Sequence, residues 1–168
     1  MAKQLLLVRH GKSDHGHLHL KDFDRPLNHK GNKNTFAMAE KLASKELTAP
    51  LLVSSPALRA ISTARHFAEA WNIPEDEIQK ELSIYEANTT ALLQVVNGLP
   101  NVFDTIAMFG HNPGFTDFAN YLADTAIYNI PTSGVVILNF DVADWAEISH
   151  HTGTMLLFDF PKNTEEPH

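Results

Sequence analysis

The feature that most constrains this chain is a run of four aliphatic residues near its start, Leu5-Leu6-Leu7-Val8, followed directly by Arg9, His10 and Gly11. Consecutive apolar residues bounded by a glycine are typical of a strand buried on both faces. Such strands occur in parallel sheets that helices cover on both sides. In open α/β sheets, ligands bind in the crevice beyond the carboxyl ends of the strands. The run therefore predicts an α/β fold and directs the search for chemistry to Arg9 and His10.

Strands and helices are predicted to alternate along the rest of the chain. Apolar spacing and capping residues predict helices over 29–47, 56–71, 89–97 and 113–122, with Ser55 as a cap and Pro56 and Pro113 as first helical residues. Buried strands are expected over 51–53 and 105–109, a weak strand or extended piece over 82–86, and two late strands over 135–140 and 154–160. We expect one three-layer α/β/α domain over residues 1–160, with a mostly parallel sheet and a polar tail over 161–168.

Apolar run length, net charge and the absence of cysteine indicate which partners and which cellular compartment to expect. The chain has no run of about 18 apolar residues, and its first strand starts almost at Met1, so neither a membrane span nor a leader peptide is expected. The net charge of −7 argues against nucleic-acid binding. The absence of cysteine excludes disulfides and thiolate chemistry and is compatible with a reducing compartment. We expect a cytoplasmic monomer.

Three predicted strand-to-loop junctions bring cations and imidazoles to one edge of the sheet. Arg9 and His10 follow the first strand, Arg59 lies in the first turn of the second helix, and His111 follows the strand over 105–109. Burying these groups together without carboxylates is costly unless a bound anion balances their charge. Two planar guanidinium groups suit the tetrahedral oxygens of phosphate. A single histidine would be explained as well by a structural role, so the prediction of an anion pocket depends on their coincidence.

Other candidate motifs are weaker. His15, His17 and His19 alternate in a polar loop, but nothing nearby completes a metal site, so we expect a solvated loop and no metal. Gly11-Lys12-Ser13 ends like a P-loop, yet the glycine required at position 6 is a leucine. Asp22, Asp24 and Arg25 are interpreted as a local ion pair.

Three motifs in this order resemble the histidine phosphatase superfamily, the fold of phosphoglycerate mutases and acid phosphatases. They are Arg9-His10-Gly11, residues 54–60 with Thr63-Ala64, and Gly110-His111-Asn112-Pro113-Gly114. Further residues are similar to the small phosphohistidine phosphatases of the SixA type: Asp22-x-x-Arg25-Pro26-Leu27 with Gly31, Tyr85-Glu86-Ala87, Pro131-Thr132-Ser133-Gly134 before a strand, and Trp145. The chain has no residues for the helical insertions that cover the site in larger members, so no large lid is expected.

The resemblance implies a covalent route in which neutral His10 attacks phosphorus and water later cleaves the phosphohistidine. Arg9 and Arg59 would bind the non-transferring oxygens, and His111, if protonated, would add a donor. No metal or cofactor is required. Glu86 is the candidate general acid, with an exposed loop acid as the alternative. Ser13 and Asn112 are second-rank phosphate contacts, and a turn-forming role for Ser13 is equally open.

The expected substrate is a phosphorylated protein carrying phosphohistidine, or a small phosphorylated molecule. A phosphoramidate leaves as imidazole, which accepts a proton readily near neutral pH, so a dedicated acid is dispensable. The near alternative is a phosphomonoesterase or mutase of the same superfamily. A different class is a non-catalytic module that recognises phosphorylated partners, although such a module needs no nucleophile. A metallohydrolase built on the loop histidines is the third alternative.

Overall fold

The computed structural model describes residues 2–15 and 19–162, which form one mixed sheet of six strands in the order β3-β2-β4-β1-β5-β6. Strand β1 (Lys3–Arg9) pairs parallel with β4 (Thr105–Gly110) and antiparallel with β5 (Val135–Phe140). Strand β2 (Leu51–Ser54) is parallel to β4 and to β3 (Gln79–Lys80). Strand β6 (Gly153–Asp159) is antiparallel to β5. The predicted mostly parallel sheet and the late antiparallel strands are confirmed.

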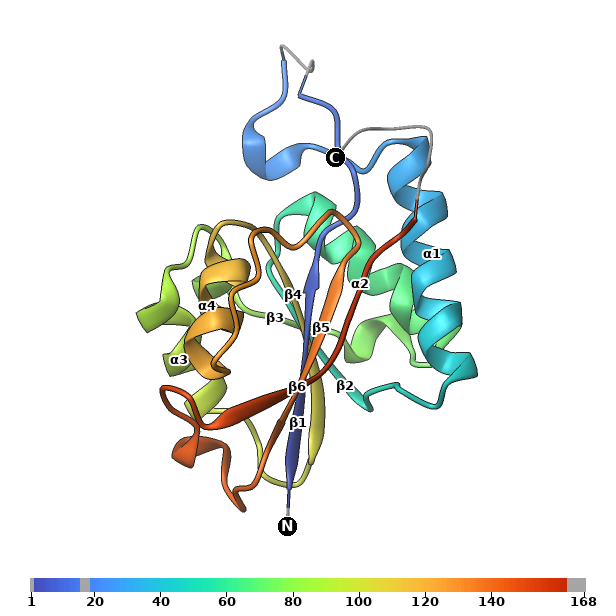
Figure 1. The fold of residues 1–168 in the computed structure, drawn as a ribbon. Helices are drawn as coiled ribbons and strands as arrows, with labels where there is room; N and C mark the ends of the chain where they lie inside the picture. The colour runs from blue at the N-terminus through green and yellow to red at the C-terminus, as the bar shows by residue number, and fades with distance from the viewer. Residues whose placement is uncertain (1, 16–18, 163–168) are drawn as a thin grey trace.

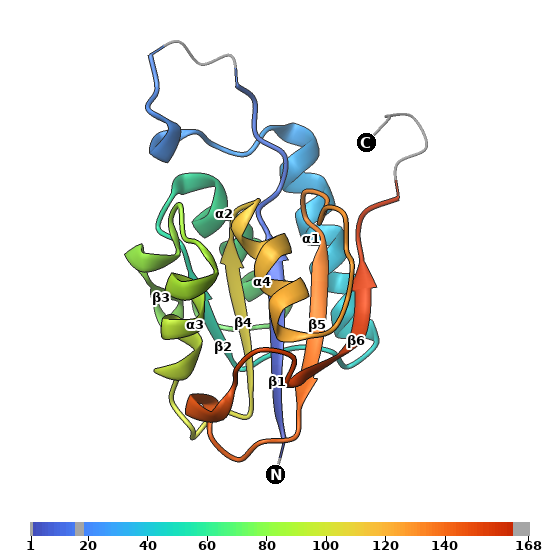
Figure 2. The ribbon, with the colours of Figure 1, turned by 60° about the vertical axis from the view of Figure 1, so that its left-hand side comes forward.

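Helices cover both faces of this sheet, as Figures 1 and 2 show. Helices α1 (His29–Ser44) and α2 (Leu58–Ala70) lie on one face, and α3 (Thr89–Asn97) and α4 (Gly114–Leu122) lie on the other. The aliphatic run in β1 explains why two layers are needed. Leu5 and Leu7 pack into the core with α3 and α4, whereas Leu6 and Val8 pack into the core with α1 and α2. All four side chains are fully buried.

The start of α2 differs from the prediction. The helix begins at Leu58, with Ala57 at the N-cap and no side-chain cap, so Ser55 is not the N-cap and Pro56 is not helical. The hydroxyl of Ser55 accepts from the Ala57 N–H at 3.3 Å, but its shorter contact is with His111 at 2.7 Å. A tertiary contact therefore holds the serine that the local pattern assigned to the helix.

Three other predicted elements differ from the structure in type or in where they begin or end. Residues 82–86 are not a strand: Leu82–Ile84 form a short 3-10 helix, capped by Glu81, and β3 is limited to the two residues that continue the register with β2. Helix α1 ends at Ser44 rather than near residue 47, because Glu46 adopts a φ of 58° and the Leu47 N–H returns to the Leu42 carbonyl. Helix α4 begins at Gly114, with Pro113 at its N-cap.

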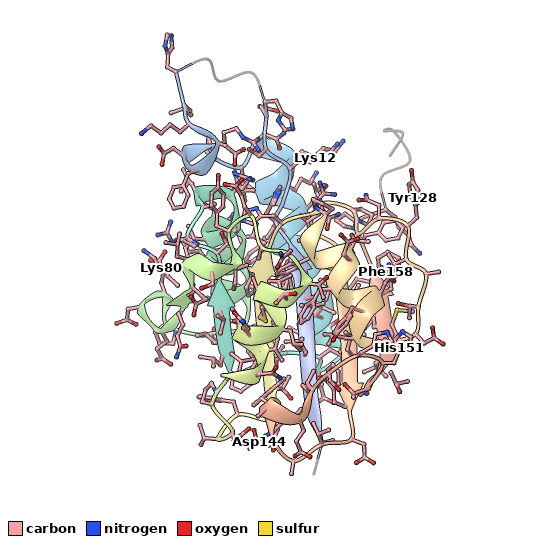
Figure 3. The ribbon with its side chains drawn as sticks, turned by 90° about the vertical axis from the view of Figure 1, so that its left-hand side faces the viewer. Lys12, Lys80, Tyr128, Asp144, His151 and Phe158 are labelled. Atoms are coloured by element: carbon pink, nitrogen blue, oxygen red, sulfur yellow. The ribbon has the colours of Figure 1, made fainter. Side chains whose placement is uncertain are left out.

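The segment that connects β1 to α1 extends beyond one end of the sheet. The described residues between β1 and α1, including the short helix η1 (Asp22–Asp24), project beyond the carboxyl end of β1 (Figure 1). Lys12 lies near that end, and Asp144 lies at the opposite end (Figure 3). The projecting segment therefore belongs to the end of the sheet where the strand-end side chains gather.

None of the helices in the described ranges is long and apolar enough to cross a membrane.

Candidate active site

The ends of β1 and β4 bring two histidines together. Arg9 of β1 lies opposite Gly110 of β4 in the parallel register, so the residues that follow them, His10 and His111, are neighbours. Their ring centroids are 5.3 Å apart, and their exposed fractions are 9% and 8%. Arg59, in the first turn of α2, points its Nε toward His10 Nε2 at 3.4 Å. The structure thus brings together three of the side chains that the sequence placed at separate junctions.

The hydrogen bond of His10 determines which ring nitrogen can react. Its Nδ1 lies 2.7 Å from the carbonyl oxygen of Gly11. Because a carbonyl only accepts, Nδ1 carries the proton and Nε2 keeps its lone pair. Burial, with added repulsion from His111, Arg59 and Arg9, lowers the pKa of His10 to about 3. At neutral pH, His10 is therefore a neutral imidazole with its nucleophilic nitrogen directed at Arg59.

The turn that holds His10 is fixed by a buried threonine of α2. The Gly11 N–H donates to Thr63 Oγ1 at 2.9 Å, and the Thr63 hydroxyl donates to the Arg59 carbonyl at 2.7 Å. A Cβ at Gly11 would lie 2.5 Å from Thr35 Oγ1, so the turn requires glycine there. Thr63 thereby connects the backbone of the nucleophile to the backbone of the helix that carries Arg59.

Arg59 has a carboxylate partner that the sequence analysis did not assign to it. Its Nη1 donates to the Asp22 carbonyl at 2.8 Å, and its Nη2 donates to Asp22 Oδ2 at 3.0 Å. These contacts occupy the distal edge of the guanidinium and leave the Nε edge facing His10. The expected ion pair between Asp22 and Arg25 is present at 3.0 Å, but it is only one of the contacts of Asp22. The premise that no carboxylate accompanies the cations is therefore wrong.

Asp22 is itself held as an anion. The phenol of Tyr85 donates to Asp22 Oδ2 at 2.7 Å. This hydrogen bond, together with those from Arg25 and Arg59, holds the pKa of Asp22 well below its usual range. Burial and the hydrogen bond to Asp22 raise the pKa of Tyr85 to about 12. The motif Asp22-x-x-Arg25 was visible in the sequence, but nothing local indicates that it folds back onto Arg59.

Arg9 and His111 are the remaining predicted side chains at this edge of the sheet, and only Arg9 is charged at pH 7. Arg9 donates through Nη1 to the Ile130 carbonyl at 2.8 Å, and burial, with repulsion from Arg59, lowers its pKa. His111 Nε2 lies 2.7 Å from Ser55 Oγ. Burial and the charge of Arg59 lower the pKa of His111 to about 4, against an opposing effect of Asp22. His111 is therefore neutral at pH 7, so a protonated His111 is not the ground state of this site.

The weaker predictions concern Ser13 and Asn112 as phosphate contacts and Glu86 as the general acid. Ser13 donates to the Pro26 carbonyl at 2.7 Å and accepts from Arg25, and Asn112 donates to Asn129 and Ile130 and accepts from Thr116. Both side chains therefore have local structural partners. Glu86 is exposed, has a φ of 55° and lines the cleft beside Tyr85. The role of Glu86 as a general acid stays a prediction.

Two adjoining hollows open over these residues and share Arg59, His111 and Asn112. The larger, of about 880 Å³, is lined by Arg9 and His10 and by the basic side chains Lys12, Arg25 and Lys30. The smaller, of about 680 Å³, is lined by Tyr85 and Glu86 and by the N-terminal residues of α3 and α4. In a chain of net charge −7, this concentration of cations suits a bound anion. An anion held at the Nε edge of Arg59 would lie beside His10 Nε2, which is 3.4 Å from Arg59 Nε.

The described part of the chain contains no group of three His, Cys, Asp or Glu side chains that could hold a metal ion. Of the three loop histidines, His17 lies outside the described residues.

A family model and the solved structures with similar folds both relate this chain to histidine phosphatases. The family model described as the histidine phosphatase superfamily, branch 1, matches residues 5–89. An uncharacterised chloroplastic protein of Arabidopsis thaliana is 28% identical over 155 residues, which cover 88% of this chain and 71% of the relative. A Nakamurella multipartitia structure named after phosphohistidine phosphatase SixA has a TM-score of 0.81 at 20% identity, covering 96% of this chain and 97% of that one. The protein histidine phosphatase SixA complexed with tungstate has a TM-score of 0.79 at 19% identity, covering 94% of this chain and 96% of that one.

Proposed function

The chain belongs to the histidine phosphatase superfamily, and from this premise we propose that it hydrolyses protein phosphohistidine through a covalent phosphohistidine on His10. One observation carries the proposal. The hydrogen bond from Nδ1 to the Gly11 carbonyl leaves the lone pair on Nε2, and Nε2 faces Arg59. A neutral nucleophile beside a fixed cation is the arrangement that phosphoryl transfer needs.

The reaction has two displacements. In the first, the Nε2 lone pair of His10 forms a bond to phosphorus, and the bond from phosphorus to the substrate nitrogen breaks. The electron pair of that bond stays on the leaving imidazole, which takes up a proton from solvent or from Glu86. In the second, water attacks phosphorus, the bond to Nε2 breaks, and its electron pair returns to His10, while the attacking water releases a proton to solvent. Arg9 and Arg59 stabilise the charge on the phosphoryl oxygens in both steps.

Two further observations support a phosphoramidate substrate. Glu86, the candidate acid, is exposed, whereas imidazole is a leaving group that needs little help near neutral pH. The fold is similar to that of SixA, a protein histidine phosphatase whose solved complex holds the oxyanion tungstate. The cations of the site come from the chain itself, so the proposal includes no metal or cofactor. The cytoplasmic location and the monomeric state stay predictions.

The test compares rates on a phosphohistidine protein and on simple phosphomonoesters. We expect a clear preference for the phosphohistidine protein. We also expect a phosphorylated enzyme intermediate, detected as an acid-labile phosphoryl label on the protein. His10→Ala should abolish both turnover and labelling while keeping some affinity for phosphate, and His150→Ala, an exposed histidine outside the cleft, should change neither.

Other outcomes would contradict parts of the proposal. A preference for the esters would assign the protein to the phosphomonoesterases of the superfamily. Unchanged turnover in His10→Ala would exclude the covalent route. Binding of phosphorylated protein without any turnover would identify a recognition module.

A further inference from the structure

Ser55 is a buried hydroxyl in contact with the second histidine of the site. Its exposed fraction is 0%, and its Oγ lies 2.7 Å from His111 Nε2. The same oxygen accepts from the Ala57 N–H at 3.3 Å. The other ring nitrogen, His111 Nδ1, is buried and has no hydrogen-bond partner among the described residues. The arrangement leaves two possible directions for the hydrogen bond between the serine and the histidine.

Counting donors and acceptors separates these two directions. If Ser55 donates to Nε2, its hydrogen is used, its oxygen accepts from Ala57, and the Nδ1–H of His111 is the one group without a partner among the described residues. If Nε2–H donates to Ser55 instead, the serine hydrogen has no acceptor among its hydrogen bonds in the described structure, and the Nδ1 lone pair is also unpaired. The first direction therefore leaves one buried group unpaired and the second leaves two, and each unpaired buried group costs more than a typical hydrogen bond contributes. The first direction leaves fewer groups unsatisfied.

We propose that Ser55 is a positioning residue that holds His111 as its Nδ1–H tautomer, so that a neutral imidazole donates a hydrogen bond to the phosphoryl group. The tautomer follows from the contacts alone, and the donation to a phosphoryl group rests on the proposed function. His111 lines both hollows of the cleft, beside Arg59 and 5.3 Å from the ring of His10. In the opposite tautomer, Nδ1 would carry a lone pair and could not donate a hydrogen bond.

The proposal explains how His111 can assist without being charged. Since burial keeps its pKa near 4, only one ring nitrogen carries a proton at pH 7. The partner of one nitrogen therefore decides what the other can do. His10 illustrates the same rule with the nitrogens exchanged, because its Nδ1 donates a hydrogen bond to the Gly11 carbonyl and the lone pair stays on Nε2, which faces Arg59 Nε at 3.4 Å. The serine and the glycine carbonyl thus give two neighbouring imidazoles opposite roles.

The test measures the tautomer directly. In protein labelled with ¹⁵N-histidine, long-range ¹H–¹⁵N correlation at pH 7 distinguishes protonated from unprotonated ring nitrogens, and the spectrum of His111→Gln identifies the signals of His111. We expect a protonated Nδ1 and an unprotonated Nε2. Addition of inorganic phosphate should shift the Nδ1–H signal. A protonated Nε2 in the free protein, or an Nδ1–H signal that saturating phosphate leaves in place, would overturn the proposal.

A pair of adjacent serines supplies matched variants. Ser55→Ala should weaken the Nδ1–H preference and lower kcat about tenfold, the effect of one net hydrogen bond, with KM within about twofold. Ser54→Ala removes an equally buried hydroxyl that donates to the Ser55 carbonyl, and it should change neither the tautomer nor kcat. An unchanged tautomer in Ser55→Ala would refute the role of the serine.

The two proposals can fail separately. The tautomer is measured on the free protein, so a protein with the expected spectrum and no turnover would contradict the phosphatase function but not the role of Ser55. If Ser55→Ala does not fold, the spectrum of the unsubstituted protein still decides the tautomer.

Discussion

At the scale of single residues, Arg59 shows how one side chain serves two partners. Its Nη1 and Nη2 bind the carbonyl and the carboxylate of Asp22, while its Nε points at the reactive nitrogen of His10. A guanidinium can do this because its donors lie in one plane at fixed angles. An ammonium group carries the same charge but cannot hold both directions at once. The site therefore depends on the shape of the cation as well as on its charge.

Substitution of Arg59 separates shape from charge. We expect Arg59→Lys to weaken the binding of inorganic phosphate about tenfold and Arg59→Ala about a hundredfold, since charge-assisted hydrogen bonds contribute roughly 1.5–3 kcal/mol. Isothermal titration calorimetry would measure both affinities. Arg65→Ala, on the same helix but paired with Glu75 away from the cleft, is the control and should bind like the unsubstituted protein. Equal affinity in every variant would remove Arg59 from the anion site.

At the scale of the elements, helix α1 fixes the loop that follows the nucleophile. Its N-cap, Asn28, accepts from the Gly31 N–H through its side chain, and the Asn28 N–H donates to the Lys12 carbonyl at 2.9 Å. The first turn of the helix lies directly against the backbone of Lys12. A Cβ on Gly31 would be 2.2 Å from the Lys12 oxygen and 2.8 Å from its nitrogen. This contact couples the position of α1 to that of His10.

A pair of glycines tests this coupling. Gly31→Ala forces a methyl group against backbone atoms, so we expect it to displace the loop, reduce phosphatase activity at least tenfold and lower the free energy of unfolding by about 1–3 kcal/mol. Gly98→Ala, at the end of α3, meets its nearest atom at 3.6 Å and should change stability by about 0.5 kcal/mol or less, with full activity. Urea unfolding and steady-state kinetics would measure both effects. Full activity in Gly31→Ala would show that the loop does not need this contact.

At the scale of the whole molecule, the protein buries two histidines beside two arginines. In the folded state, the pKa values of His10 and His111 are about 3 and about 4, compared with 6.5 for an unperturbed histidine. At a pH between the folded pKa of each histidine and 6.5, the unfolded chain binds more protons than the folded protein. The contribution of the two neutral histidines to the free energy of unfolding is therefore fully retained above about pH 6.5 and is lost as the pH falls toward about 4 for His111 and about 3 for His10.

The dependence on pH should be measurable by urea unfolding between pH 7.5 and pH 5. Each histidine adds a slope that approaches about 1.4 kcal/mol per pH unit below its unfolded pKa. We expect His10→Asn to remove one such contribution and to leave that of His111. Identical slopes in the unsubstituted protein and in His10→Asn would show that His10 does not fold in its neutral form.

The sequence by itself determined the features that depend on local order. Four aliphatic residues in a row required a strand covered on both faces, and the helices predicted over 29–47 and 89–97 are present as α1 and α3. Because the carboxyl ends of parallel strands meet at one edge, the order of the motifs also predicted that His10 and His111 would be neighbours.

Only the tertiary structure decided which partner each group in the cleft has. Asp22 reaches Arg59 across 37 positions, and Ser55 reaches His111 across 56. Periodicity and capping rules report neighbours within a few residues, so they assigned Asp22 to Arg25 and Ser55 to its own helix. The path of the loops sets the longer contacts, and through them the loops fix how the guanidinium of Arg59 and the ring of His111 are presented to the cleft.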